Sequence, residues 1–141
     1  MADNISTVAS IYEAFGRGDV AAILATLSDD VQWEEWSDNR AQQAGVPCLQ
    51  HRRGKAGAGE FFAVAAQLQI HDFTVLSLMG GGNQVAVEVL IDATAPGGGR
   101  YRDEELHLWT FNGDGKIVRL RHYVDTAKHI AAAQRSAATS A

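Results

Sequence analysis

The sequence predicts an α+β fold, with helices in the first half of the chain and a largely antiparallel sheet in the second. Apolar residues recur at helical spacing in the first half, whereas the second half alternates apolar and polar residues over segments of strand length. Glycine-rich turns at 80–83, 96–99 and 112–115 separate those segments and favour a meander of neighbouring strands. Since no repeat or linker is visible, we expect a single domain over residues 1–141, with its core at about 4–135.

Three helices are expected before the sheet, each marked by apolar side chains that repeat every three or four residues. A glycine followed by an aspartate, Gly18 and Asp19, suits the end of the first helix and the cap of the second. Residues 37–53 are polar and irregular, which predicts a long loop. The expected helices cover residues 4–17, 20–27 and 54–69, the last becoming helical only after its opening glycines.

Alternation assigns a face to each side chain of the expected strands. In the first strand, Val31, Trp33 and Glu35 share the face that points toward the helices. The expected strands cover residues 31–36, 72–79, 84–94, 100–111 and 116–124, and a helix over 125–135 with a frayed tail closes the chain. The last two strands direct inward Asp103, Glu105, His107, Trp109 and Phe111 from one and Val118, Leu120, His122 and Val124 from the other.

The last hairpin predicts a pairing of polar residues inside the fold. Its turn length places Glu105 opposite His122, and His107 opposite Leu120. Burying such groups is costly unless they are paired or reach a solvated cavity. We therefore expect a charge-assisted hydrogen bond between Glu105 and His122. A satisfied polar pair within the core and a functional site are both compatible with this pattern.

Composition and charge exclude several classes of protein. Lys and Arg number 12 against 17 Asp and Glu, a formal charge of −5, and no basic cluster is present, which argues against nucleic acid or an anionic membrane as partner. No uncharged stretch is long enough to cross a bilayer, and residues 1–20 show no secretory signal. The lone Cys48 has no internal disulfide partner, which suits the cytoplasm. The expected partner is a small molecule or another protein.

Four segments carry a family resemblance: Ile11–Asp19, Leu27–Glu34, Phe111–Val118 and Arg121–Asp125. Through them the chain resembles the SnoaL-like and ketosteroid-isomerase-like branch of the NTF2-like superfamily. The resemblance implies a cone, in which a strongly curved mixed or antiparallel sheet wraps around three N-terminal helices and a C-terminal helix follows. It also implies one deep pocket and a homodimer formed through the outer face of the sheet.

The resemblance also points to site residues. Glu35 falls where ketosteroid isomerases hold their proton-abstracting aspartate, and His107 falls where they hold the protonated aspartate of the oxyanion hole. Their oxyanion tyrosine is replaced by Ile11, with Tyr12 beside it. An aspartate of limonene-epoxide-hydrolase-like members is replaced by His122, which removes a carboxylate that epoxide hydrolysis needs.

The first functional hypothesis is a proton-transfer enzyme without a cofactor, an isomerase, cyclase or lyase acting next to a carbonyl of a small, largely apolar metabolite. Glu35, desolvated among aromatic side chains, is the expected base. His107 and Tyr12 are expected to stabilise the enolate oxygen, and Glu105 to orient His122. Residues expected to line or cap the pocket are Trp33, Trp36, Trp109 and His51.

Three other readings of the same residues remain open. A binding module without turnover needs the same pocket. A metal site needs two histidines and a carboxylate, for which His107 and His122 with Glu35 or Glu105 qualify, although no metal is expected. A structural dimerisation domain needs an exposed sheet face, and the strand over 84–94 offers one mixed face beside one apolar face.

Overall fold

One six-stranded sheet wraps around the helices of the first half of the chain. The computed structural model describes residues 3–140, with side chains as far as Ala138, so residues 1, 2 and 141 of the expected domain lie outside the described range. Along the chain the elements are α1 (Asn4–Gly16), α2 (Val20–Leu24), β1 (Leu27–Trp33), α3 (Arg40–Gln43), the 3-10 helix η1 (Pro47–Leu49), β2 (Arg52–Arg53), α4 (Gly54–Ala65), β3 (Gln69–Gly81), β4 (Gln84–Thr94), β5 (Arg100–Phe111), β6 (Ile117–Tyr123) and α5 (Thr126–Ser140).

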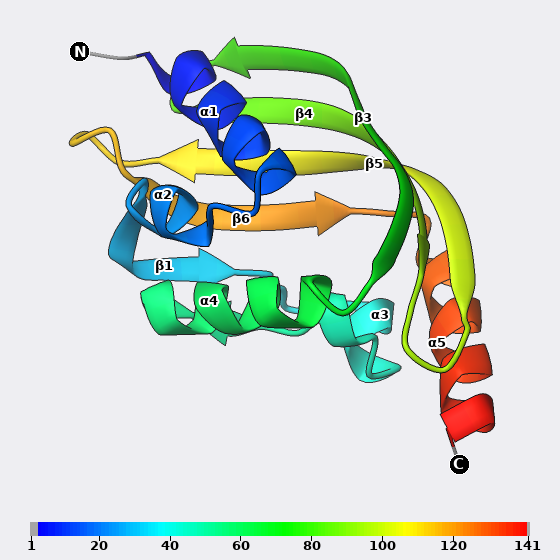
Figure 1. The fold of residues 1–141 in the computed structure, drawn as a ribbon. Coiled ribbons are helices and arrows are strands. Elements are labelled where there is room, and N and C mark those ends of the chain that lie inside the picture. Colours follow the sequence, from blue (N-terminus) through cyan, green and yellow to red (C-terminus); the bar gives the residue numbers. More distant parts are fainter. Residues whose placement is uncertain (1–2, 141) are drawn as a thin grey trace.

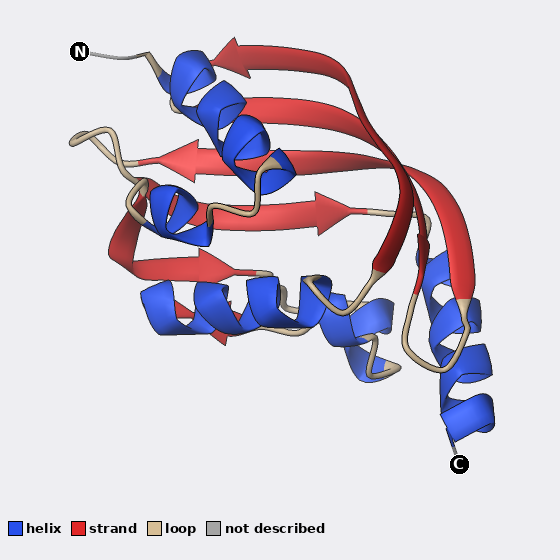
Figure 2. Cartoon of the chain, viewed as in Figure 1, coloured by secondary structure: helices blue, strands red, loops and turns tan. Residues whose placement is uncertain are grey.

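The sheet is mixed and strongly curved. Its strand order is β2-β1-β6-β5-β4-β3, in which β1 runs parallel to β6 and all other neighbours are antiparallel. Figure 1 shows β3, β4 and β5 bending around α1, with α4 beside β1 and α5 beyond the far end of β5. Figure 2 shows the same division into a curved sheet and the helices that it partly encloses. The predicted α+β cone is confirmed.

Local signals explain where the helices begin and end. The carboxylate of Asp3 accepts a hydrogen bond from the backbone N–H of Ser6 and caps α1. Gly18 takes a positive φ of 72°, which only glycine adopts freely, and turns the chain toward α2. Helix α4 begins directly at Gly54, earlier than predicted, and α5 continues to Ser140, where a frayed tail was expected.

The loop predicted over residues 37–53 contains regular structure. Short helical segments form at α3 and η1, and β2 adds a sixth strand that pairs with β1. A two-residue strand and single helical turns have too little hydrophobic periodicity to be recognised in a sequence.

The core lies between α1, α4 and the inner face of the sheet. Alternating residues of β4 are buried, with Val85, Val87 and Val89 fully enclosed, so the apolar face of this strand is the inner one. The largest buried cluster includes Val8, Ile11, Ala14, Val31, Trp33, Phe61, Phe62, Trp109, Phe111 and Leu120. Among the described residues no helix is long and apolar enough to cross a bilayer.

The predicted register of the last hairpin is wrong by two residues. His107 pairs with His122, instead of Leu120, because the turn closes between Phe111 and Ile117 and a bulge follows. The side chain of Asn112 accepts a hydrogen bond from the backbone N–H of Lys116, which holds that residue in the turn. A shift of two residues preserves the faces of Leu120 and His122, since side chains alternate with period two. The bulge places Ile117 opposite Phe111, so Ile117 is the buried residue where Val118 was predicted.

Candidate functional site

A cavity of about 80 Å³ lies between α1, α4 and the inner face of the sheet. It is smaller than the cavity of about 150 Å³ that encloses benzene in an engineered core, so binding of a ring-sized ligand requires the surrounding side chains to move. Its apolar wall includes Trp33, Phe61, Phe62, Phe73, Trp109 and Leu120. Its polar wall consists of Tyr12, Tyr101, Glu105, His107, His122 and His129.

A wider surface hollow adjoins the cavity. It has a volume of about 580 Å³, is bounded by α1, α4 and β3, and shares Tyr12, Phe15, Phe62 and Leu68 with the cavity wall. Because the two spaces share these side chains, movement of the aromatic groups among them would join the surface hollow to the cavity.

The buried Glu34 pairs with the partly buried His122, whose imidazole lines the polar wall of the cavity. Strand β1 ends opposite Leu120, and Glu34 then takes a φ of 60°, the one left-handed residue other than glycine in the described chain. Such a conformation costs on the order of 1–3 kcal/mol and is typical of functional sites. It is held by hydrogen bonds from the Glu34 N–H to the Leu120 carbonyl, 2.9 Å, and from the Gln42 side chain to the Glu34 carbonyl, 2.6 Å.

The Glu34 carboxylate sets the tautomer of His122. Oε1 lies 2.7 Å from Nδ1 of His122 and also accepts the backbone N–H of that residue, while Oε2 accepts the indole N–H of Trp36 at 3.0 Å. Nδ1–H of His122 therefore donates to Glu34. No described residue hydrogen-bonds to Nε2 of His122, so this imidazole keeps a lone pair at the wall of the cavity.

The predicted inward position of Glu35 is wrong. The left-handed turn at Glu34 breaks the alternation of the strand, so Trp33 and Glu34 are both buried, with 1% of each exposed, and Glu35 is exposed. The carboxylate at the site is thus one residue earlier than the strand pattern and the family resemblance placed it. Residue type gave no signal, because Asn, Asp and Gly are the residues usually found at positive φ.

A second polar chain crosses the cavity wall. Tyr12 and Nδ1 of His107 are 2.6 Å apart, and the indole N–H of Trp109 donates to the Tyr12 hydroxyl at 3.1 Å. Nε2 of His107 lies 3.1 Å from Oε1 of Glu105. The simplest assignment has Tyr12 donating to a neutral His107, which donates through Nε2–H to the Glu105 carboxylate.

Burial and partners move the pKa values of these groups apart. Burial, assisted by the nearby His122, lowers the pKa of His107, which agrees with the neutral tautomer. Burial also disfavours protonation of His122, but the charge and hydrogen bond of Glu34 outweigh it and raise the pKa. Burial alone would raise the pKa of Glu105, yet hydrogen bonds from two histidines hold it well below its usual value.

Two side chains that were expected at the pocket, Trp36 and His51, lie elsewhere. Trp36 is absent from the cavity wall and packs from outside, 4.2 Å below the guanidinium of Arg121. His51 is exposed and bonds Gln32 at 3.0 Å. Glu105, paired with His107, does not orient His122, because the hairpin register differs from the prediction.

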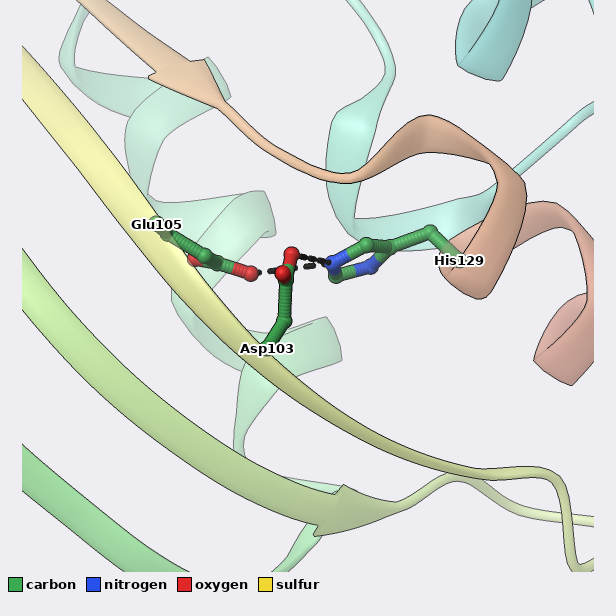
Figure 3. Close-up of side chains that lie close together, drawn as sticks. All are labelled: Asp103, Glu105 and His129. Atoms are coloured by element: carbon green, nitrogen blue, oxygen red, sulfur yellow. Dashed lines mark hydrogen bonds and ion pairs between the residues drawn. The ribbon is translucent and has the colours of Figure 1, made fainter.

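A second group of ionisable side chains adjoins the first. Asp103 and Glu105 project from β5 toward His129 on α5, and all three are buried (Figure 3). The inward direction of Asp103 follows from strand alternation, but its contact with His129 brings together residues 26 apart. The alanine-rich sequence around His129 contains no motif that marks it as a site residue.

Solved structures with the same fold include proteins described as NTF2-like. One from Burkholderia pseudomallei, of unknown function, is 25% identical, covers 92% of this chain and 96% of its own, and has a TM-score of 0.75. Another, from Burkholderia thailandensis, is 24% identical over 96% and 98%, with a TM-score of 0.76. TerC, co-crystallised with polyporic acid, is 26% identical over 92% and 98%, with a TM-score of 0.73.

The family follows from a further comparison. No curated protein matches the chain significantly. The SnoaL-like domain model matches residues 8–120, which include most of α1, all of α4 and β1 to β5, and part of β6. Since this match spans most of the sequence and the fold agrees with the NTF2-like structures, the chain belongs to the SnoaL-like domain family.

Proposed function

We propose that this protein catalyses proton transfer next to a carbonyl group in a small, largely apolar organic molecule held in the inner cavity. The Glu34–His122 pair is the observation that carries the proposal. A carboxylate fixes Nδ1–H of the imidazole, and Nε2 is left without a partner among the described residues at the polar wall of the cavity. This arrangement suits a general base that later returns the proton as an acid.

The reaction assigned to this pair balances within the bound molecule. Nε2 of His122 takes a proton from the carbon beside the carbonyl, so a C–H bond breaks and an N–H bond forms. The electron pair moves to the carbonyl oxygen and gives an enolate, while Glu34 stabilises the imidazolium. Returning the proton to a different carbon completes an isomerisation. In a cyclisation the enolate carbon attacks a second carbonyl of the same molecule, and the oxygen of that carbonyl takes the proton back from Nε2 of His122.

Tyr12 is the proposed hydrogen-bond donor to the enolate oxygen. Its hydroxyl lies at the cavity wall, accepts the indole N–H of Trp109 and is directed by His107. When a carbonyl oxygen replaces His107 as acceptor, the bond strengthens as negative charge develops, which is the condition for catalysis. The similarity to TerC, which was co-crystallised with polyporic acid, supports an organic ligand.

The proposal is tested by binding and exchange measured together. Small cyclic ketones, such as 3-cyclohexen-1-one, are screened by quenching of tryptophan fluorescence, and NMR then follows incorporation of solvent deuterium into each bound compound. Loss of the base should slow exchange by about 10²–10⁴-fold in His122→Gln, with a smaller loss in Glu34→Gln. Glu35→Gln, in which the exposed neighbour is changed, should retain the rate.

A binding module without turnover is the second candidate, favoured by the enclosed apolar cavity itself. It predicts ligands that quench tryptophan fluorescence but gain no deuterium. Deuterium exchange is also compared between variants: a wild-type rate in both His122→Gln and Glu34→Gln would contradict the assignment of His122 as the base.

A further inference from the structure

Asp103, Glu105 and His129 form a compact group of potential metal ligands (Figure 3). Nε2 of His129 lies 3.0 Å from Oδ2 of Asp103 and 3.0 Å from Oε2 of Glu105. One ligating atom from each residue lies within 4.8 Å of the others. The exposed fractions are only 4%, 6% and 5%, in the same order, so water gives these groups little solvation.

The two carboxylates of this group need a compensating positive charge. The ion pairs described for the two carboxylates have only histidine partners. His129 pairs with both Asp103 and Glu105, and His107 pairs with Glu105. Two carboxylates in a nearly dry site are costly unless a positive charge compensates them. A divalent cation with neutral His129 would make the group electrically neutral.

The separations also suit a metal ion. With metal–ligand bonds of about 2.1 Å, two ligands at a right angle lie about 3.0 Å apart, and two ligands at a tetrahedral angle lie about 3.4 Å apart. The two distances from His129 therefore match ligands at a right angle. For ligands at a tetrahedral angle, each distance would have to lengthen by a few tenths of an ångström. The same distances suit a single N–H shared between both carboxylates, which is the arrangement without metal.

We propose that Nε2 of His129 and carboxylate oxygens of Asp103 and Glu105 bind a divalent first-row transition metal, with Zn²⁺ and Mn²⁺ as suitable ions. One imidazole and two carboxylates combine the ligands that these ions accept. The set differs from the His107–His122 combination considered from the sequence.

Neighbouring groups would hold the ligands in place. Nε2 of His107 bonds the remaining oxygen of Glu105, and the backbone N–H of Asp125 bonds Asp103 at 3.0 Å. Such outer partners orient metal ligands and support affinity. Because Glu105 and His129 also line the cavity, an open coordination position would face the space assigned to the substrate.

Metal binding is measured on the untagged full chain without any substrate, so the result is independent of the proposed proton transfer. After treatment with a chelator and dialysis, the protein is titrated with ZnCl₂ by calorimetry and with MnCl₂ by electron paramagnetic resonance. We expect one ion per chain. His129→Gln and Asp103→Asn should each weaken binding at least about 100-fold, since each removes a direct ligand.

His71→Gln is the matched control, because His71 is an exposed histidine bonded only to Thr94 and its loss should leave the affinity unchanged. Wild-type protein that binds neither ion, or binding that survives in both ligand variants, overturns the proposal. If the variants do not fold, thermal unfolding of the wild type decides: bound metal must raise the Tm, and a Tm that neither Zn²⁺ nor Mn²⁺ changes contradicts the site.

Discussion

Replacing Glu34 by glutamine tests whether this buried carboxylate, rather than its exposed neighbour, organises the site. The carboxylate accepts three hydrogen bonds, two from His122 and one from Trp36. A glutamine of the same shape can keep its oxygen toward His122, but its NH₂ group then faces the indole N–H of Trp36. Glu35→Gln changes the same chemical group one residue later, where the side chain is exposed.

The structure sets the expected size of the effect. Hydrogen bonds to charged groups contribute about 1.5–3 kcal/mol and neutral ones about 0.5–1.5 kcal/mol, so weakening the two bonds to His122 costs about 2 kcal/mol. The lost bond to Trp36 adds about 1 kcal/mol, giving a decrease of about 3 kcal/mol in the free energy of unfolding. For a chain of this size that corresponds to a fall in Tm of about 10 °C.

Urea unfolding followed by tryptophan fluorescence and a thermal scan measure both variants. Glu35→Gln should stay within about 0.5 kcal/mol of the wild type, as surface substitutions usually do. Equal losses in the two variants, or a loss below about 1 kcal/mol in Glu34→Gln, would refute the assignment of Glu34 as the structural and functional partner of His122.

Three further measurements follow from the site. Tyr12→Phe leaves two buried hydrogen-bond partners unpaired and should cost about 1–3 kcal/mol in urea unfolding, whereas Tyr123→Phe, at an exposed position, should change little. Because Glu34 raises the pKa of His122 in the folded state, the stability that this pair contributes is full below about pH 6.5 and is lost as pH rises through the folded pKa. Urea unfolding between about pH 5.5 and 8.5 should show this decrease in the free energy of unfolding. Glu34→Gln should make that free energy less dependent on pH. Burial raises the pKa of the Cys48 thiol to about 11, so alkylation near pH 8 should be slow in the native protein and fast in urea, and equal rates would contradict this environment.

Alternation along the strands could be interpreted from the sequence because it depends on local geometry. The inward face of β5, from Asp103 through Glu105 and His107 to Trp109, is buried as predicted. The hairpin shift did not disturb that result, since it moved the pairing by an even number of residues. Which residues paired across the strands was not predictable, because a turn held by the side chain of Asn112 and a bulge changed the register.

The sequence by itself determined the α+β class, the SnoaL-like family and the inward residues of β5, because helical and strand periodicity are properties of neighbouring residues. Only the tertiary structure decided which carboxylate reaches His122. One left-handed residue at the end of β1 reversed the expected directions of Glu34 and Glu35. Only the fold brought His129 from the last helix to the carboxylates of β5, because contacts between distant segments depend on packing that no local pattern contains.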